Sequence, residues 1–418
     1  MYQIDLSLKR ISCVLFVFLL IWCVTDAVDD NRYLSPKKFG QLRGDEIIRF
    51  YGYPGEEHKV LTEDGYILTN FRIANPGGYP ILFIHGLTAT SDCWFVGGPA
   101  HDLSFRLWRR GYDVWLWNGR GNLYSMDHVN ISWSDEKFYK FSMHELGYYD
   151  TTASIDYILN VTGHKSVITI GHSMGTTNVL IAAASRPEYQ PKIALNILLA
   201  PGAFQRNLVT RGFSDTSYSQ YVRWFNFDHL ERILEKDSFY FKINQLFCDP
   251  TGPTAELCYF SMGLISGLGS NQTVKDAVMK MMTKFPAGTS LNVLKQEIQN
   301  LRSGDFSPLS YSRKENLKRY GTPKPSPYPL GKVQIPTAIY YGCCNDLLSH
   351  VKDTKLLKSR LPNVIRFYKV PYRLFNHGDF LWAKDAYRLL YKDIIILIDQ
   401  FTPYQYRSNV TIEPVSID

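Results

Sequence analysis

A glycine-flanked serine is the strongest chemical signal in this sequence. The segment Gly171–Gly175 reads Gly-His-Ser-Met-Gly, which matches the pattern G-x-S-x-G. It follows an apolar run that predicts a buried strand and precedes a helix-forming stretch, which is the context that this motif requires. The serine then lies on a sharp, strained turn, with its hydroxyl near the positive end of the following helix. Ser173 is therefore a candidate nucleophile for acyl transfer, whereas the alternative is a chance match on a solvent-exposed turn.

A base must accept the proton of that hydroxyl, and His377 is the candidate. In hydrolases with this motif the chain order is serine, then aspartate or glutamate, then histidine. His377 follows a predicted strand at residues 364–370 and so suits a loop above the edge of a sheet. His350 lies too close to the candidate acid to belong to a separate loop. The alternative for His377 is a surface-loop histidine with no catalytic role.

Asp346 is the candidate acid because it comes just after a predicted strand at residues 335–341. A carboxylate in this place would hold the imidazole in one tautomer and stabilise its charged form. Asp353 is the rival, but the sequence around it, Val-Lys-Asp-Thr-Lys, is typical of a solvated helix.

The tetrahedral intermediate of acyl transfer also needs hydrogen-bond donors for its oxyanion. One is expected from the backbone N–H of Met174, which follows the nucleophile, and another from the loop around His85–Leu87, which follows an apolar strand. We interpret His85 as a structural turn residue and His172 as a packed or orienting residue. Metal-ligand spacing is absent at four further histidines: His101, His128, His144 and His164.

The elements that must position these residues alternate between short apolar runs and helical patterns. An Asp-Gly turn inside residues 57–73 predicts a hairpin. Further strands are predicted at 80–84, 112–117, 166–170 and 193–199, and helices at 101–110, 144–159 and 176–184. This alternation predicts an α/β fold with a mostly parallel sheet and helices on both faces.

The alternation stops after Pro201. Residues 204–330 are aromatic-rich and mostly helical in pattern, without a clear buried parallel strand. Strand signals then resume, and a closing helix is predicted at 383–400. We therefore assign residues 28–203 and 331–418 to an α/β core and 204–330 to a helical cap, or lid, over the carboxyl edge of the sheet, where open α/β sheets bind ligands.

The N-terminus has the pattern of a signal peptide, residues 1–27. Lys9 and Arg10 precede an apolar run at residues 11–24, which is shorter than the roughly 17–25 residues of a membrane span. An uncleaved anchor is the alternative, and no later stretch is typical of a transmembrane segment. Four sequons fit a secretory route and predict glycosylation at Asn130, Asn160, Asn271 and Asn409.

Composition and cysteine count restrict the protein further. The 418 residues are 45% hydrophobic and 20% charged, which is typical of a globular protein. The net charge is +7, and the sequence has no run of Lys and Arg residues that would indicate nucleic-acid binding. Five cysteines remain outside the predicted signal peptide, so at least one thiol is free or bonded between molecules. They are Cys93, Cys248, Cys258, Cys343 and Cys344. Cys248 and Cys258 flank a turn-rich stretch, so a local disulfide between them is plausible. The cysteines do not have the spacing of zinc ligands, so the sequence predicts no metal site.

These motifs and their flanks together resemble the acid lipase family, which includes gastric lipase and lysosomal acid lipase. The resemblance extends through most of the chain and rests on Glu57–Leu68, His85–Leu87, Asp113–Leu116, Arg120–Asn122, Ile155–Leu159, Gly171–Thr177, Ser303–Phe306, Asn316–Gly321, Asn345–Asp346 and Asn376–His377.

The resemblance implies an α/β-hydrolase fold and a triad of Ser173, Asp346 and His377. It also implies Leu87 and Met174 as oxyanion donors, and a Cys248–Cys258 disulfide. The implied substrates are triacylglycerols and sterol esters met at an oil or membrane interface, without a metal or organic cofactor, by a protein that is secreted or delivered to lysosomes. The sequence does not indicate an oligomeric state.

Two departures from the family affect substrate preference more than reaction type. Met174 stands where the family often has glutamine, and residues 371–376 differ in sequence. Other esterase, thioesterase or peptidase chemistry on the same fold is one alternative, which activity across acyl chain lengths would separate. A non-catalytic secreted lipid carrier is another, but a carrier does not need all three triad residues in order.

Overall fold

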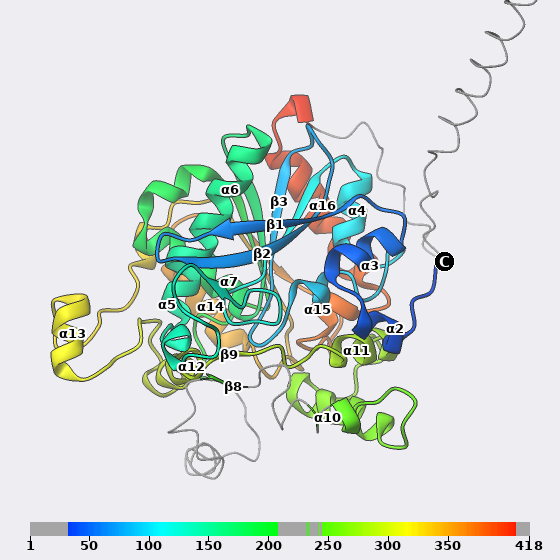
Figure 1. Ribbon diagram of the computed structural model, residues 1–418. Helices are drawn as coiled ribbons and strands as arrows, with labels where there is room; N and C mark the ends of the chain where they lie inside the picture. The colour runs from blue at the N-terminus through cyan, green and yellow to red at the C-terminus, as the bar shows by residue number, and fades with distance from the viewer. Residues whose placement is uncertain (1–31, 208–231, 234–241, 243–244, 407–418) are drawn as a thin grey trace, which may run out of the picture.

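The computed structural model describes residues 32–207, 232–233, 242 and 245–406. A sheet of nine strands runs through the centre of the molecule (Figure 1). Its strands are β1 (Gly55–Leu61), β2 (Tyr66–Ile73), β3 (Pro80–Ile84), β4 (Asp113–Leu116), β5 (Asp127–His128), β6 (Val167–His172), β7 (Ile193–Leu199), β10 (Thr337–Tyr341) and β11 (Val364–Lys369).

The order of strands is β1-β2-β4-β3-β6-β7-β10-β11, and β5 pairs with β2. From β4 to β11 every neighbouring pair is parallel, whereas β1, β2 and β5 are joined to the sheet by antiparallel pairing. A separate antiparallel pair is formed by β8 (Arg232–Ile233) and β9 (Thr289–Ser290). The mostly parallel sheet of the predicted α/β fold is thus confirmed.

The described α-helices precede, connect and follow these strands. They are α2 (Pro36–Gln41), α3 (Gly44–Phe50), α4 (Leu103–Arg109), α5 (Met143–Glu145), α6 (Thr152–Thr162), α7 (Met174–Ser185), α10 (Ala255–Ser266), α11 (Lys275–Met282), α12 (Leu291–Ser303), α13 (Arg313–Tyr320), α14 (Val351–Arg360), α15 (Asp379–Trp382) and α16 (Lys392–Phe401). Local sequence sets several ends: α12 begins after Ser290, whose hydroxyl accepts from Asn292 N–H, and ends at Gly304 in the left-handed conformation.

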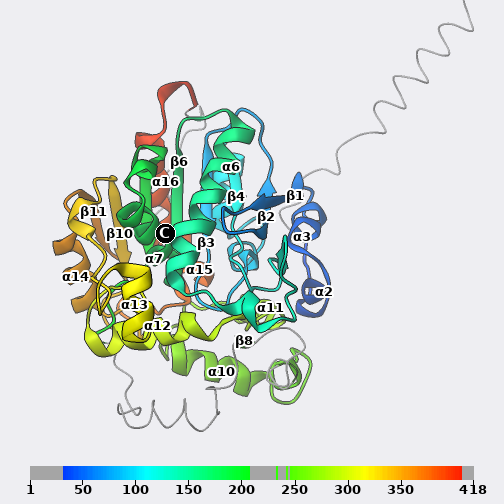
Figure 2. The same ribbon diagram turned by 60° about the vertical axis from the view of Figure 1, so that its left-hand side comes forward.

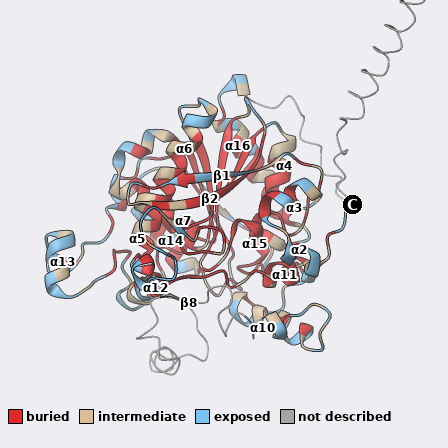
Figure 3. Cartoon of the chain, viewed as in Figure 1, coloured by how far each residue is buried: buried red, intermediate tan, exposed pale blue. Residues whose placement is uncertain are grey.

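The two faces of the sheet carry separate apolar cores because successive side chains on a strand point in opposite directions. In β3, Ile81 and Phe83 belong to the cluster that includes residues of α3, α4 and α16. Leu82 and Ile84 belong to the cluster with residues of α6, α7 and α14. Figure 3 shows the buried sheet between helices whose outer faces are exposed. This three-layer arrangement is what a continuous apolar run such as 80–84 predicts.

The predicted strands and helices of the core are present, with two differences in detail. The helix predicted at 144–159 consists of α5, a π-helical segment at Leu146–Thr151, and α6. The closing helix begins later than predicted, with a π-helical turn at Tyr387–Tyr391 followed by α16. The spacing of apolar residues does not distinguish these wider π-helical turns from an α-helix. The sequence therefore predicts one continuous helix in each place.

The described part of residues 204–330 contains α10, α11, α12, α13, β8 and β9. Figures 1 and 2 both show α10, α11 and α12 together at one end of the sheet. Residues 208–231, 234–241 and 243–244 of this segment lie outside the described residues, as do the predicted signal peptide and Asn409.

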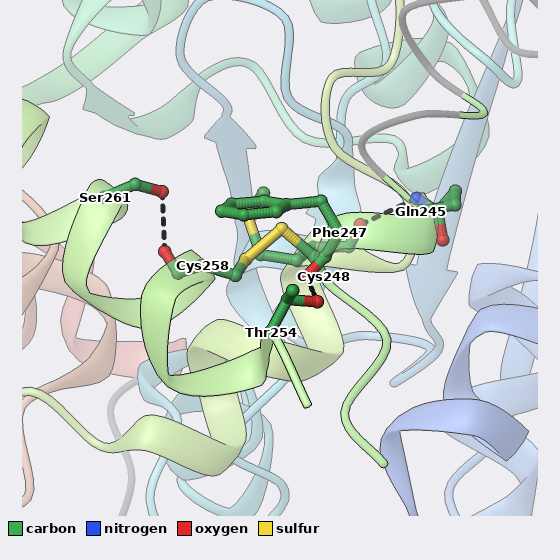
Figure 4. Close-up of a disulfide and its surroundings, with 7 residues drawn as sticks. Gln245, Phe247, Cys248, Thr254, Cys258 and Ser261 are labelled. Carbon is green, nitrogen blue, oxygen red and sulfur yellow. Dashed lines mark hydrogen bonds between the residues drawn. A yellow bond between two sulfur atoms is a disulfide. The ribbon is translucent and has the colours of Figure 1, made fainter. Parts of the chain in front are cut away.

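Two disulfides are formed among the five cysteines that the structure describes. Cys248, before α10, is joined to Cys258 in the second turn of α10, and Figure 4 shows the bond beside the Phe247 ring. Cys343 is joined to its neighbour Cys344. Cys93 is free and buried, in keeping with the odd number of cysteines outside the predicted signal peptide.

Removing the Cys248–Cys258 bond is expected to destabilise the start of α10. In the chain-entropy account, closing a loop of about ten residues stabilises the folded state by about 2–3 kcal/mol. The double variant Cys248→Ser/Cys258→Ser should therefore lose about this much in urea unfolding relative to the wild type. Equal stability of the two proteins, each purified without reductant, would contradict the expectation.

Candidate active site

Ser173 lies between β6 and α7 with strained backbone dihedral angles, φ 54° and ψ −125°. The flanking glycines allow this turn. A Cβ at position 171 would lie 2.7 Å from the carbonyl oxygen of Gly175, and a Cβ at position 175 would lie 2.2 Å from the carbonyl oxygen of Ile84. The chain can therefore make this strand-to-helix turn only with both glycines, as the motif predicts. A positive φ at a non-glycine residue is costly and typical of functional sites.

The loops that follow β10 and β11 bring His377 and Asp346 together. His377 Nδ1 lies 3.0 Å from Asp346 Oδ1, and both side chains are buried. The same carboxylate oxygen accepts hydrogen bonds from the N–H groups of Leu348 (3.0 Å) and Ser349 (2.9 Å). With Nδ1 donating to the carboxylate, Nε2 of His377 is left as a proton acceptor.

Nε2 of His377 is buried and has no hydrogen-bond partner among the described residues. His377 and Ser173 line the same cavity. The geometry is that of a base held in one tautomer beside a strained serine.

The two rivals considered from the sequence are placed elsewhere. Asp353 is buried rather than solvated, which corrects the expectation for its helix: its carboxylate accepts hydrogen bonds from the backbone N–H (2.8 Å) and the side-chain amide (2.7 Å) of Asn207. His350 is the N-cap of α14 and accepts from Lys352 N–H. Both residues thus have structural partners of their own.

His172 contacts His377, the candidate base, directly. Its Nε2 lies 3.0 Å from the carbonyl oxygen of His377, and the two ring centroids are 4.6 Å apart. Burial, reinforced by the nearby His377, lowers the pKa of His172 well below its usual value. A neutral His172 therefore donates to this carbonyl, which agrees with its interpretation as an orienting residue.

The expected oxyanion loop runs directly beside the nucleophile. A Cβ at Gly86 would lie only 3.1 Å from Ser173 Cβ, and the next residue, Leu87, lines the cavity. Met174 is the first residue of α7, where a backbone N–H has no partner within the helix. Met174 thus follows Ser173 directly, and the residue before Leu87 packs beside it.

His85 holds this loop in place. Its Nδ1 donates to the carbonyl oxygen of Gly86 (2.8 Å), and its Nε2 accepts from the side-chain amide of Asn122 (3.2 Å). Burial lowers the pKa of His85 to about 4, so the ring stays neutral. It is a structural turn residue, as interpreted from the sequence.

A cavity of about 380 Å³ opens beside Ser173. Its walls are mainly apolar and come from the core as well as from α10, α11 and α12. The larger apolar side chains are Leu87, Met262, Ile265, Met281, Phe285, Leu294, Ile298, Leu301, Leu348, Leu381 and Trp382. Enclosed apolar cavities with a few polar groups are typical of sites for small apolar ligands.

The end of α10 is tied to the loop that carries the histidine. The N–H of His377 donates to the carbonyl oxygen of Ser266 (3.1 Å), and the side-chain amide of Asn376 donates to that of Gly267 (2.9 Å). Asp379 in turn accepts from Asn376 N–H (2.9 Å). Sequence reasoning missed these positioning residues, because the partners that join α10 to this loop lie more than one hundred positions apart and no local pattern marks them.

Sequence reasoning also missed Gln205 and Glu297, which line the cavity. Glu297 lies on an α12 face that is otherwise apolar, and an acidic residue on such a face was the available signal. Among the predicted glycosylation sites, Asn130, Asn160 and Asn271 are exposed. In the described ranges, no three His, Cys, Asp or Glu side chains are grouped as they would be around a metal ion.

Comparison with known proteins was made on sequence and on structure. The family described as "alpha/beta hydrolase fold" matches residues 79–371, and a partial α/β-hydrolase lipase region matches residues 45–98. Among solved structures, a membrane phospholipase A superposes with a TM-score of 0.51 at 13% identity, covering 95% of this chain and 99% of that one, which supports the fold. None of the helices within the described residues is both long enough and apolar enough to cross a membrane.

The relatives found by sequence are named as lipases. "Lipase 1" of Drosophila melanogaster is 37% identical over 361 residues, which cover 86% of this chain and 80% of the relative. Human gastric triacylglycerol lipase is 32% identical over 368 residues, which cover 85% of this chain and 90% of that lipase. Mouse lipase member K is 30% identical over 378 residues, which cover 85% and 90%. The chain therefore belongs to the α/β-hydrolase family and, within it, to the acid lipases, and it is a carboxylic ester hydrolase.

Proposed function

We propose that this protein enters the secretory pathway and hydrolyses esters of neutral lipids, triacylglycerols and sterol esters, through an acyl-enzyme on Ser173. The observation that carries the proposal is the hydrogen bond of 3.0 Å between His377 Nδ1 and Asp346 Oδ1. Within the described part of the chain His377 Nε2 has no hydrogen-bond partner, and His377 lines the same apolar cavity as the strained Ser173. The names of the relatives, among them a gastric triacylglycerol lipase, support the substrate class.

In the first half of the reaction, Ser173 Oγ bonds to the ester carbonyl carbon while its proton passes to His377 Nε2. The carbonyl oxygen becomes an oxyanion, which the N–H groups of Leu87 and Met174 stabilise. When the intermediate collapses, the bond between the carbonyl carbon and the alcohol oxygen breaks. The imidazolium then donates its proton to the leaving alcohol, and the acyl group stays on Ser173.

In the second half, a water molecule replaces the alcohol. It loses a proton to His377 Nε2 as its oxygen bonds to the acyl carbon, and the same donors stabilise the new oxyanion. The bond to Ser173 Oγ breaks, the proton returns to that oxygen, and the free fatty acid leaves. Asp346 stabilises the imidazolium in both halves without exchanging a proton itself.

An exposed apolar face on α10 supports action at a lipid surface. Leu257, Phe260 and Leu264 repeat along one side of this helix and are each about half exposed, at 55%, 50% and 52%. Ile265 of the same helix lines the cavity, so the exposed face adjoins the site. An apolar helix face next to an acyl-binding cavity fits contact with oil or membrane.

Removing part of this face is expected to weaken action on emulsions specifically. Burying one large apolar side chain contributes about 1.5–3 kcal/mol, so Phe260→Ser/Leu264→Ser should raise the emulsion surface needed for half-maximal rate by about tenfold or more. Hydrolysis of a dissolved short-chain ester serves as the control and should change little. An equal loss on both substrates would contradict a role at the interface.

The cap and the cellular route belong to the same proposal. The helices of residues 204–330 that line the cavity support a cap over the site. The exposed sequons at Asn130, Asn160 and Asn271 fit the secretory route, to the extracellular space or to lysosomes. Expression with the natural leader tests this part: cleavage after residue 27 and loss of mass on glycosidase treatment are the expected results.

Fatty acid release decides the proposal as a whole. Emulsified long-chain triacylglycerol and cholesteryl ester are supplied separately to the folded, glycosylated protein, from acidic to neutral pH. Release from either supports a neutral-lipid esterase and identifies its alcohol preference. No release from either, with a short-chain ester still hydrolysed, would replace the lipase proposal with a different esterase.

A further inference from the structure

One face of α12 forms part of the cavity wall beside Ser173. Its cavity-lining residues are Leu294, Glu297, Ile298 and Leu301, which follow the i, i+3, i+4, i+7 spacing of a single helix face. Three of the four are apolar, as the wall of an acyl-binding site requires. The fourth carries a carboxyl group in the middle of the stripe.

Gln205 connects this carboxyl to the catalytic turn. The side chains of Gln205 and Glu297 lie close enough to interact, and both line the cavity. A Cβ built on Gly202 would lie 3.7 Å from Gln205 Nε2 and 3.6 Å from the backbone carbonyl of Ser173. The amide and carboxyl pair therefore begins beside the nucleophile and extends along the cavity wall.

The described structure gives Glu297 no ion-pair partner, and the acyl-transfer steps do not use it. Burial raises the pKa of Glu297 to about 7, although the interaction with Gln205 acts in the opposite direction. At acidic pH the carboxyl is thus largely uncharged, and it can both donate and accept a hydrogen bond. Polar groups placed in this way in an apolar pocket commonly select a matching polar group on the ligand.

We propose that Glu297 and Gln205 form a polar subsite that binds a hydroxyl group carried by the substrate ester. A hydroxyl both donates and accepts, so it matches the carboxyl and amide pair, whereas a purely aliphatic substrate offers this pair neither a donor nor an acceptor. The hydroxyl belongs either to the alcohol part, as in a partial glyceride, or to the acyl chain. This inference rests on the proposed ester hydrolysis at Ser173.

Two pairs of substrates separate these sources. 1,2-Dioctanoylglycerol is compared with propane-1,2-diol dioctanoate, which lacks the hydroxyl on the alcohol part. Methyl hydroxydecanoates, with the hydroxyl at different chain positions, are compared with methyl decanoate. The measured quantity is the ratio of kcat/KM for the hydroxylated and plain member of each pair.

The variants are Glu297→Leu, Glu297→Gln and Gln205→Met. Lys295→Leu, on the exposed side of α12, is the matched control. Because an unsatisfied buried polar group costs about 1–3 kcal/mol, the wild type should prefer a hydroxylated ester by about 10- to 100-fold in at least one pair. The ratio should fall close to one in Glu297→Leu, stay intermediate in Glu297→Gln and be retained in Lys295→Leu. If Glu297→Leu does not fold, Gln205→Met tests the same subsite, and it should lower the ratio of kcat/KM for the hydroxylated and plain esters.

The outcomes are distinguishable. Preference in the glyceride pair alone assigns the hydroxyl to the alcohol part, and preference in the decanoate pair alone assigns it to the acyl chain. Ratios that agree within about twofold between wild type and Glu297→Leu in both pairs would overturn the subsite while leaving ester hydrolysis intact. Absence of hydrolysis of every ester by the wild type would instead remove the proposed function itself.

Discussion

Ser173→Ala is expected to lower the turnover of emulsified long-chain triacylglycerol by about a millionfold, because loss of a nucleophile of this kind removes the whole acyl-enzyme route. The residual rate would come from the oxyanion donors and from substrate binding alone. Alanine keeps the Cβ and removes only the hydroxyl oxygen, so the strained turn can form unchanged. Fatty acid release per mole of folded enzyme is the measurement.

Ser185→Ala provides the matched control for this experiment. Ser185 is the last residue of α7, the helix that begins directly after the nucleophile, and it lies outside the cavity. Its variant should retain wild-type turnover. If Ser173→Ala kept more than about one thousandth of the activity, far above the residual rate expected without a nucleophile, acyl transfer through this serine would be wrong.

Asp346→Asn is expected to lower turnover by about ten thousandfold, the size of effect that follows when the acid of a triad becomes an amide. The asparagine can still accept from the N–H groups of Leu348 and Ser349 through its carbonyl oxygen, so the loop should keep its shape. The negative charge that stabilises the imidazolium of His377 is lost, and the amide no longer enforces one tautomer. The maximal value of kcat should therefore fall, and the dependence of kcat on pH should also change.

Asp353→Asn is the control that the chain itself offers. Asp353 is buried like Asp346 and also follows β10, but its partner is Asn207 rather than a histidine. Its variant should lose thermal stability more than activity per folded molecule. The double variant Ser173→Ala/Asp346→Asn should be no slower than Ser173→Ala, because triad residues act as a unit. Loss of activity in Asp353→Asn with retention in Asp346→Asn would reassign the acid.

Much of the core can be predicted from the sequence because buried parallel strands are continuous apolar runs. The strands predicted at residues 80–84 and 193–199 have the same bounds in the structure. Ser173 is identifiable because its requirements are local: two glycines, one strand and one helix. His377 and Asp346 can be proposed from chain order, because the loops of this fold meet at one edge of the sheet, and the structure brings the two side chains into hydrogen-bond contact.

The remaining features depend on contacts between distant segments. The bond from Asn376 to Gly267 and the pairing of Gln205 with Glu297 join parts of the chain that no periodicity relates. The sequence predicts a solvated Asp353 because its neighbours along the chain are charged, whereas Asn207 covers it in the fold. Local composition reports the average environment of a helix, and the burial of a single carboxylate on it depends on what packs against it.

The two hydrogen bonds between α10 and the histidine loop have a consequence for how substrate enters. The carbonyl of Ser266 binds the N–H of His377, so a swing of this end of α10 would also displace the imidazole from Asp346. A movement of the cap at another point would leave His377 hydrogen-bonded to Asp346, whereas a movement at this end of α10 would disturb that hydrogen bond. The orientation of the imidazole and the position of this end of α10 thus depend on one shared set of hydrogen bonds.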